Sequence, residues 1–70
     1  MLLLHAINFN KSKFTKEETL ETLRDLKQYP IANRDTDNFY MYRINPINSD
    51  LKNFYTTSLA DGLINFVYQY

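Results

Sequence analysis

Apolar stretches alternate along this chain with polar segments rich in turn-forming residues, and this pattern predicts a small sheet with one helix. The densest stretch is Asn38–Ile44, which is strongly aromatic and contains neither Gly nor Pro. Aromatic and branched side chains pack well on a pleated surface, and the flanking Asn, Asp and Pro residues favour turns. Both alternating faces of this stretch are largely apolar. We therefore predict that it is the central strand, covered on both sides.

Further stretches predict three more strands. Leu2–Phe9 is apolar on both alternating faces, which leaves open the face that points to the core. Asn53–Leu59 is predicted to be a third strand, antiparallel to the central one, and the turn signal Asp61-Gly62 joins it to a fourth strand, Leu63–Tyr70. Alternation places four apolar residues on one face of this last strand: Ile64, Phe66, Tyr68 and Tyr70. We expect this aromatic C-terminal strand to be an edge that pairs with another chain.

A helix is predicted from Lys16 to about Gln28. Thr15 is a good N-cap, and Glu18 three residues later completes a capping box. The apolar stripe of this helix consists of Leu20, Leu23 and Leu26. Pro30 disfavours helical geometry at the residue before it, so the helix should end ahead of it.

The segment Ile31–Asp37 is predicted to be a loop. The predicted order is thus β-α-β-β-β, an α+β fold in which a small antiparallel sheet of three to four strands carries one helix on a face. At 70 residues the chain forms a single domain, residues 1–70.

The composition excludes several kinds of stabilising site. There is no Cys and His5 is the only His, so we expect no disulfide, no metal site of thiolates or several imidazoles, and no cofactor. A chain of this size buries a small share of its surface, and association is the remaining stabiliser. The composition therefore favours a protein partner or self-association.

The charge pattern argues against binding driven by the nucleic-acid backbone. Eight basic and eight acidic residues give a net charge of zero, and the basic residues are scattered among the acidic ones. The apolar segment Met1–Ile7 is too short and too uncharged for a secretory signal or a membrane span. We expect a protein that is neither secreted nor membrane-spanning.

Three segments together resemble a small domain found in phage and large-DNA-virus proteins. They are Phe9–Glu18 leading into the Leu-rich helix, the aromatic stretch Asn38–Ile44, and Phe54–Leu63 with its Asp-Gly. The chain departs from that domain in lacking a second basic residue after Arg43 and in having Thr56-Thr57-Ser58 where a basic residue is common. The resemblance implies this fold, a viral origin and a location in the host cytoplasm or the virion, and it implies no catalytic role.

Two single residues carry possible chemistry. His5 is interpreted as a hydrogen-bonded or half-exposed structural residue rather than a ligand, because no acid or nucleophile is identifiable beside it. Arg43 either reaches out of the sheet to bind something or packs its stem on aromatic neighbours. With Gly62 as the only Gly, no phosphate-binding Gly-rich loop is possible, and we predict that the protein is not an enzyme.

The favoured hypothesis is a small structural or interaction protein that docks in a larger, viral assembly. Its candidate contact residues are aromatic, because such side chains supply interface area at low entropic cost: Tyr55, Phe66, Tyr68 and Tyr70. One alternative is single-stranded nucleic-acid binding by a sheet face that stacks bases on Tyr40, Tyr42, Arg43 and Tyr55. A second alternative is a phage-encoded inhibitor of a host protein.

Overall fold

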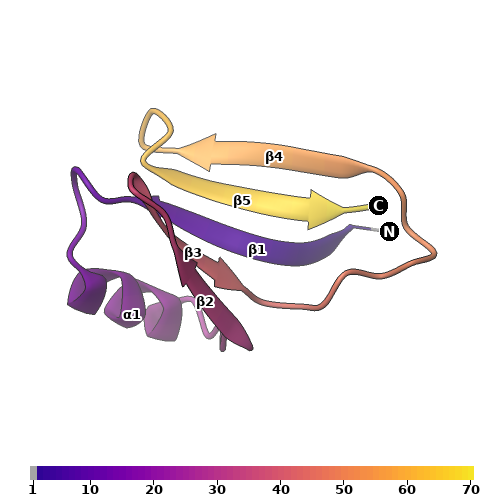
Figure 1. The fold of residues 1–70 in the computed structure, drawn as a ribbon, viewed down its shortest axis with the longest axis horizontal. Coiled ribbons are helices and arrows are strands. Elements are labelled where there is room, and N and C mark those ends of the chain that lie inside the picture. Colours follow the sequence, from indigo (N-terminus) through magenta and orange to yellow (C-terminus); the bar gives the residue numbers. More distant parts are fainter. Residues whose placement is uncertain (1) are drawn as a thin grey trace.

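Within residues 2–70, which the computed structural model describes, five strands form one antiparallel sheet and one helix packs on a face of it (Figure 1). The elements follow the chain as β1 (Leu3–Asn10), α1 (Lys16–Asp25), β2 (Ala32–Asp35), β3 (Phe39–Arg43), β4 (Phe54–Leu59) and β5 (Ile64–Gln69). The order across the sheet is β2-β3-β1-β5-β4. The predicted α+β class, with one helix on an antiparallel sheet, is confirmed, and the sheet has one strand more than expected.

The middle of the sheet is β1, and the expectation that Asn38–Ile44 would occupy it was wrong. β1 pairs with β3 on one side and with β5 on the other. Its Ile7 and Phe9 are fully buried and form the core together with Leu23, Tyr42 and Ile44. The strand order depends on pairing between segments that are distant in sequence, and local composition does not encode it.

The two faces of the sheet differ, so β3 is not covered on both sides. We call the face that packs against α1 the helix face and the opposite one the open face. On the helix face, the hydroxyl of Tyr42 hydrogen-bonds the hydroxyl of Thr19 on α1. The neighbouring Arg43 points the other way and is exposed. Alternation along β3 is therefore confirmed, but only one of its faces is core.

A β-bulge at His5 sets the faces of β1. Leu4 lies opposite Tyr68 and Ala6 lies opposite Val67, so His5 is an extra residue in the pairing with β5. After the bulge the alternation resumes with its phase shifted by one residue. Leu4, Ile7 and Phe9 thus share the helix face, which strict alternation along Leu2–Phe9 would not allow.

The predicted loop Ile31–Asp37 contains a strand. Ala32–Asp35 pairs antiparallel with β3, and a tight turn follows in which Thr36 N donates to Phe39 O at 2.9 Å. All four residues of β2 are exposed, so no buried side chain produces an apolar alternation there. Main-chain hydrogen bonds to β3 hold this edge strand. Such bonds do not depend on apolar side chains, so the pattern of apolar residues does not predict the strand.

α1 begins where the sequence predicts and ends earlier. The capping box between Thr15 and Glu18 is present. At the other end, Gln28 N donates to Leu23 O, and Lys27 N to Arg24 O, with Lys27 at a φ of 57°. These two bonds form a Schellman motif, which ends the helix at Asp25 instead of near Gln28. The left-handed position after a helix is usually Gly, and here it is Lys27. The sequence therefore does not indicate that the helix ends at this point.

Replacing the helix cap tests the predicted N-terminus. The Thr15 hydroxyl accepts from Glu18 N at 3.2 Å, and Glu18 Oε1 accepts from Thr15 N at 2.9 Å. We expect Thr15→Ala to lower the free energy of unfolding by about 1 kcal/mol in urea titrations, because one helix N–H loses its partner. Thr15→Ser keeps the hydroxyl and should lose much less. Equal losses in the two variants would contradict this role.

Of the predicted Leu stripe, only Leu23 is buried. It lies one turn after the buried Thr19, while Leu20 and Leu26 are 43% and 45% exposed. At ten residues, α1 is too short and too polar to cross a membrane, and it is the one helix within residues 2–70.

The C-terminal strand is not at the edge of the sheet. β5 lies between β1 and β4, and β4 occupies the edge, so the expected edge position of Leu63–Tyr70 was wrong. The turn from β4 to β5 is confirmed at Ala60, Asp61 and Gly62, which all have positive φ. β4 runs antiparallel to β3 but does not pair with it, because β1 and β5 lie between them.

Candidate functional site

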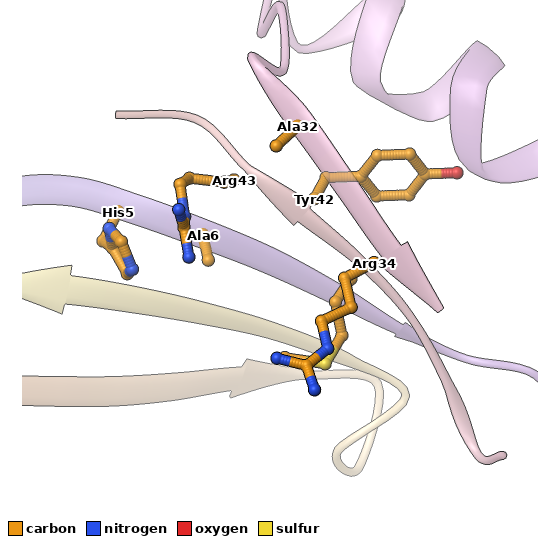
Figure 2. Close-up of a pocket in the computed structure, with 7 residues that line it drawn as sticks. His5, Ala6, Ala32, Arg34, Tyr42 and Arg43 are labelled. Atoms are coloured by element: carbon orange, nitrogen blue, oxygen red, sulfur yellow. The ribbon is translucent and has the colours of Figure 1, made fainter. Parts of the chain in front are cut away.

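A pocket of about 320 Å³ lies on the open face, where β2, β3 and β1 run side by side (Figure 2). It combines two guanidinium groups and an imidazole with small and apolar side chains. Its lining consists of His5, Ala6, Ala32, Arg34, Met41, Tyr42 and Arg43. The ring of Tyr42 points away toward the helix, so the pocket side is formed by the other six side chains (Figure 2).

The strand register explains why there is space at this place. Arg43 lies directly between Ala6 on β1 and Ala32 on β2. Directly opposed residues in antiparallel strands share a face, and two methyl side chains leave the guanidinium stem without bulky neighbours. Arg34 lies opposite Met41, one pair further along the same face. Two arginines on adjacent strands thus border one depression.

His5 is fixed at the rim of the pocket by the loop that follows β3. Its Nδ1 lies 2.8 Å from the carbonyl oxygen of Asn45. A carbonyl only accepts, so Nδ1 carries the proton and Nε2 is left for other partners. The Asn45 side chain is anchored in turn, since its Nδ2 donates to Leu4 O at 2.7 Å. The hydrogen bond expected of His5 is thus present.

The open face carries positive charge although the chain is neutral. Asp35 is the only acidic residue in any of the strands β1–β5. It lies on the helix face, because it pairs with Tyr40, and its carboxylate binds Lys16 Nζ at 3.1 Å. A hydrogen bond from Asn33, with Lys16 beside it, lowers the pKa of Asp35 below its ordinary value. Neither Arg34 nor Arg43 forms an ion pair with any of residues 2–70.

A second surface lies on the helix face, over β4 and β5, which α1 leaves uncovered. We call it the aromatic band, and it consists of Tyr55, Leu59, Phe66, Tyr68 and Tyr70. Tyr55 and Tyr68 are directly opposed, with ring centroids 6.5 Å apart. Phe66 packs against the core, whereas Tyr55 is 51% and Leu59 55% exposed. The four residues predicted to contact a partner lie together in this band.

The residues predicted to stack bases are not on one surface. Tyr42 is 1% exposed in the core, and Tyr40 beside it packs against the same core. The ammonium groups of Lys11 and Lys16 lie 5.1 and 5.3 Å from the centroid of the Tyr40 ring. Arg43 is on the open face, opposite to all of these tyrosines. The sheet therefore offers no platform made of Tyr40, Tyr42, Arg43 and Tyr55.

Sequence reasoning singled out Arg43 but missed the residues that make a pocket around it. Arg34 lay in a segment taken for a loop, and Ala6 and Ala32 have no chemistry of their own. A usable signal was present nonetheless, because the predicted strands contained Arg43 and His5 and no acidic residue. Charge of one sign on strand positions indicates a charged sheet face.

Within residues 2–70 there is no cluster of three or more His, Asp or Glu side chains that could hold a metal ion. No protein-family model, no curated protein and no solved structure matches this chain.

Proposed function

We propose that this chain is a non-enzymatic interaction protein that pairs with itself through the outer edge of β4 and the adjoining aromatic band, and that acts in a larger assembly as this dimer. The occupant of this edge is a second copy of the chain. The observation that carries the proposal is an edge strand with none of the usual protection against pairing.

The two edges of the sheet differ in this respect. Edge strands with free main-chain groups are templates for pairing, and proteins usually block them with charges, Pro, bulges or short length. β2 is four residues long and carries Arg34 and Asp35. β4 is six residues long, and its sequence Phe-Tyr-Thr-Thr-Ser-Leu has no charge and no Pro. The edge at β4 is thus the one suited to receive another strand.

Charges at the two ends of β4 favour a second copy over a foreign strand. Lys52 precedes β4 and Asp61 follows it, and both are exposed. In an antiparallel pair related by a two-fold axis, the Lys52 end of one copy meets the Asp61 end of the other. Opposite charges therefore come together at both ends of the pair, and no charge lies between them.

One register also joins the aromatic bands of the two copies. With Thr57 on the two-fold axis, Tyr55 of each copy lies opposite Leu59 of the other, on the helix face. Directly opposed aromatic and aliphatic side chains stabilise a sheet by about 0.2–1 kcal/mol per pair. The two largely exposed residues of β4 on this face would thus cover each other.

A charge-pair experiment tests both the partner and the register. We expect the wild-type protein to sediment as a dimer at about 100 µM and to dissociate on dilution. Tyr55→Lys and Leu59→Glu should each raise the dissociation constant roughly two- to thirtyfold, because each removes two opposed pairs per dimer. An equimolar mixture of the two variants should recover dimers, since the mixed dimer pairs the new charges with each other and keeps one native Tyr55–Leu59 pair.

Ser12→Lys, in the exposed turn after β1, is the matched control and should leave the dimer unchanged. A wild-type protein that stays monomeric at all concentrations would contradict the proposal. Variants that weaken the dimer but do not recover on mixing would contradict the register.

We further propose that the assembly is viral, with the chain acting in the host cytoplasm or in a virion. This part rests on the resemblance of Phe9–Glu18, Asn38–Ile44 and Phe54–Leu63 to a domain of phage and large-DNA-virus proteins. Detection of the chain in purified particles by mass spectrometry tests it.

A further inference from the structure

We infer that the pocket between Arg34, Arg43 and His5 is a binding site for the phosphate group of a phosphorylated small molecule. It lies on the open face, and the proposed dimer uses the β4 edge and the helix face. A ligand in the pocket therefore leaves the β4 edge free, and a change at one of these surfaces does not alter the other.

The two arginines of the pocket have no acidic partner among residues 2–70. Arg34 and Arg43 lie on adjacent strands and border the same depression, and no carboxylate is among its lining residues. The chain segregates charge along β2, where Arg34 points to the open face and the next residue, Asp35, points to the helix face and binds Lys16. Two cations on one face without an acid leave two positive charges for a ligand to neutralise.

The geometry of arginine selects the kind of anion. A guanidinium presents a planar fork of N–H donors, which matches the oxygen atoms of phosphate or carboxylate in pairs. A carboxylate offers two oxygens and one charge, which one guanidinium satisfies. A phosphate monoester has three terminal oxygens and carries close to two negative charges near neutral pH, which matches two guanidinium groups.

The third polar group of the pocket is already oriented for a ligand. The Asn45 carbonyl holds Nδ1 of His5 at 2.8 Å, and the ring stands edge-on to Phe54 with centroids 6.0 Å apart. These contacts fix the ring plane and leave Nε2 without a protein partner among residues 2–70. Nε2 can accept a hydrogen bond from a ligand hydroxyl, or donate one when the ring is protonated.

The size and walls of the pocket indicate more than a bare phosphate ion. Its volume of about 320 Å³ exceeds what one phosphate group fills, and it falls at the small end of ligand pockets, which begin at about 300 Å³. Met41, Ala6 and Ala32 supply an apolar wall beside the arginines. The ligand class is thus a compact organic phosphate, such as a nucleoside monophosphate or a sugar phosphate.

Titration of the ¹⁵N-labelled 70-residue chain at about pH 7.5, where the phosphate monoester is doubly charged, tests this inference. The probes are a nucleoside monophosphate, the same nucleoside without phosphate, and inorganic phosphate, all at one ionic strength. We expect the monophosphate to shift the amide resonances of Ala6, Arg34 and Arg43 with saturation, and the nucleoside to shift none. Stronger binding of the monophosphate than of inorganic phosphate assigns an organic ligand, and equal binding assigns the free ion.

Variants of the two arginines identify the site. Arg34→Gln and Arg43→Gln should each weaken binding of the monophosphate about tenfold or more, because each removes one charge-assisted fork. Arg43→Lys, which keeps the charge but loses the fork, should also weaken it measurably. Arg24→Gln, the same change at an exposed position of α1, should leave the affinity unchanged within about twofold. Thermal unfolding of each variant checks that the fold is kept.

Absence of saturable shifts with both phosphate probes would overturn the inference. An equal loss of affinity in Arg24→Gln would also overturn it, because attraction to the whole protein would then explain the binding. A single-stranded oligonucleotide that binds while the monophosphate does not would favour a nucleic-acid surface instead of this pocket.

Discussion

Replacing Tyr42 by alanine is expected to remove most of the stability of the protein at 25 °C. The ring is 1% exposed and packs edge-on against Phe9, with ring centroids 5.8 Å apart. Removing a large buried aromatic ring from a core costs about 3–5 kcal/mol, through lost transfer energy and the cavity left behind. A domain of this size has a total stability near the lower end of about 5–15 kcal/mol. The Tyr42 side chain alone therefore accounts for much of the free energy of unfolding.

Two further variants separate the contribution of the Tyr42 ring from that of its hydroxyl: Tyr42→Phe, and Tyr29→Ala as an exposed control. The Thr19 hydroxyl donates to Lys16 O at 2.6 Å, so it is the Tyr42 hydroxyl that donates to Thr19. Tyr42→Phe keeps the ring and loses this bond, and should lower the free energy of unfolding by about 1 kcal/mol. Tyr29→Ala, at a position that is 72% exposed, should cost less than about 0.5 kcal/mol. Circular dichroism with urea denaturation measures all three variants, and a folded Tyr42→Ala protein with near-normal stability would refute this assignment of the core.

Replacing Gln69 by leucine is expected to detach the loop between β3 and β4 and to destabilise the protein by about 2–4 kcal/mol. Gln69 is 1% exposed, and its Nε2 donates to Asn48 O at 2.7 Å and to Leu51 O at 2.6 Å. Its Oε1 accepts from Asn48 N at 2.9 Å. Leucine has a similar size but no polar atoms, so these main-chain groups would lose their partners. Each such loss costs about 1–3 kcal/mol when the group stays buried, and detachment of the loop limits the total because it returns these groups to water.

Amide hydrogen exchange measures the effect of Gln69→Leu on the loop between β3 and β4 separately from its effect on the whole protein. The Asn48 amide should exchange much faster in Gln69→Leu, while the amides of β1 should change only as far as global stability falls. Gln28→Leu is the matched control, because the Gln28 side chain forms no hydrogen bond among residues 2–70. Equal stability losses in the two variants would show that the Gln69 side chain does not hold the loop. The same loop supplies Asn45 to His5, so the variant should also loosen the rim of the pocket.

The gap between predicted and observed candidate sites has a geometric cause. Alternation correctly placed Phe66, Tyr68 and Tyr70 on one face of the last strand, and these residues lie in the aromatic band. The nucleic-acid hypothesis combined Tyr42 and Arg43, which are neighbours in sequence and therefore lie on opposite faces of a strand. The proposed pocket instead joins Arg43 to Arg34 and His5, residues that only the pairing of β3 with β2 and β1 brings onto one face.

The sequence by itself determined the features that depend on near neighbours. Thr15 and Glu18 define the start of the helix, Asp61-Gly62 defines the last turn, and alternation along Ile64–Gln69 defines the face of β5. Each of these depends on contacts over at most a few residues, so local chemistry suffices to specify it.

Only the tertiary structure decided the strand order, the existence of β2 and the bulge at His5. Main-chain hydrogen bonds between strands are the same for any residue, so the partner of a strand is chosen by how well distant side chains pack. β1 became the middle strand because its Ile7 and Phe9 fill the space against Tyr42 and Leu23. The same strand order places β4 at an unprotected edge, where we propose that a second copy pairs. It also places Arg34 and Arg43 on the open face, where we propose that a phosphate group binds.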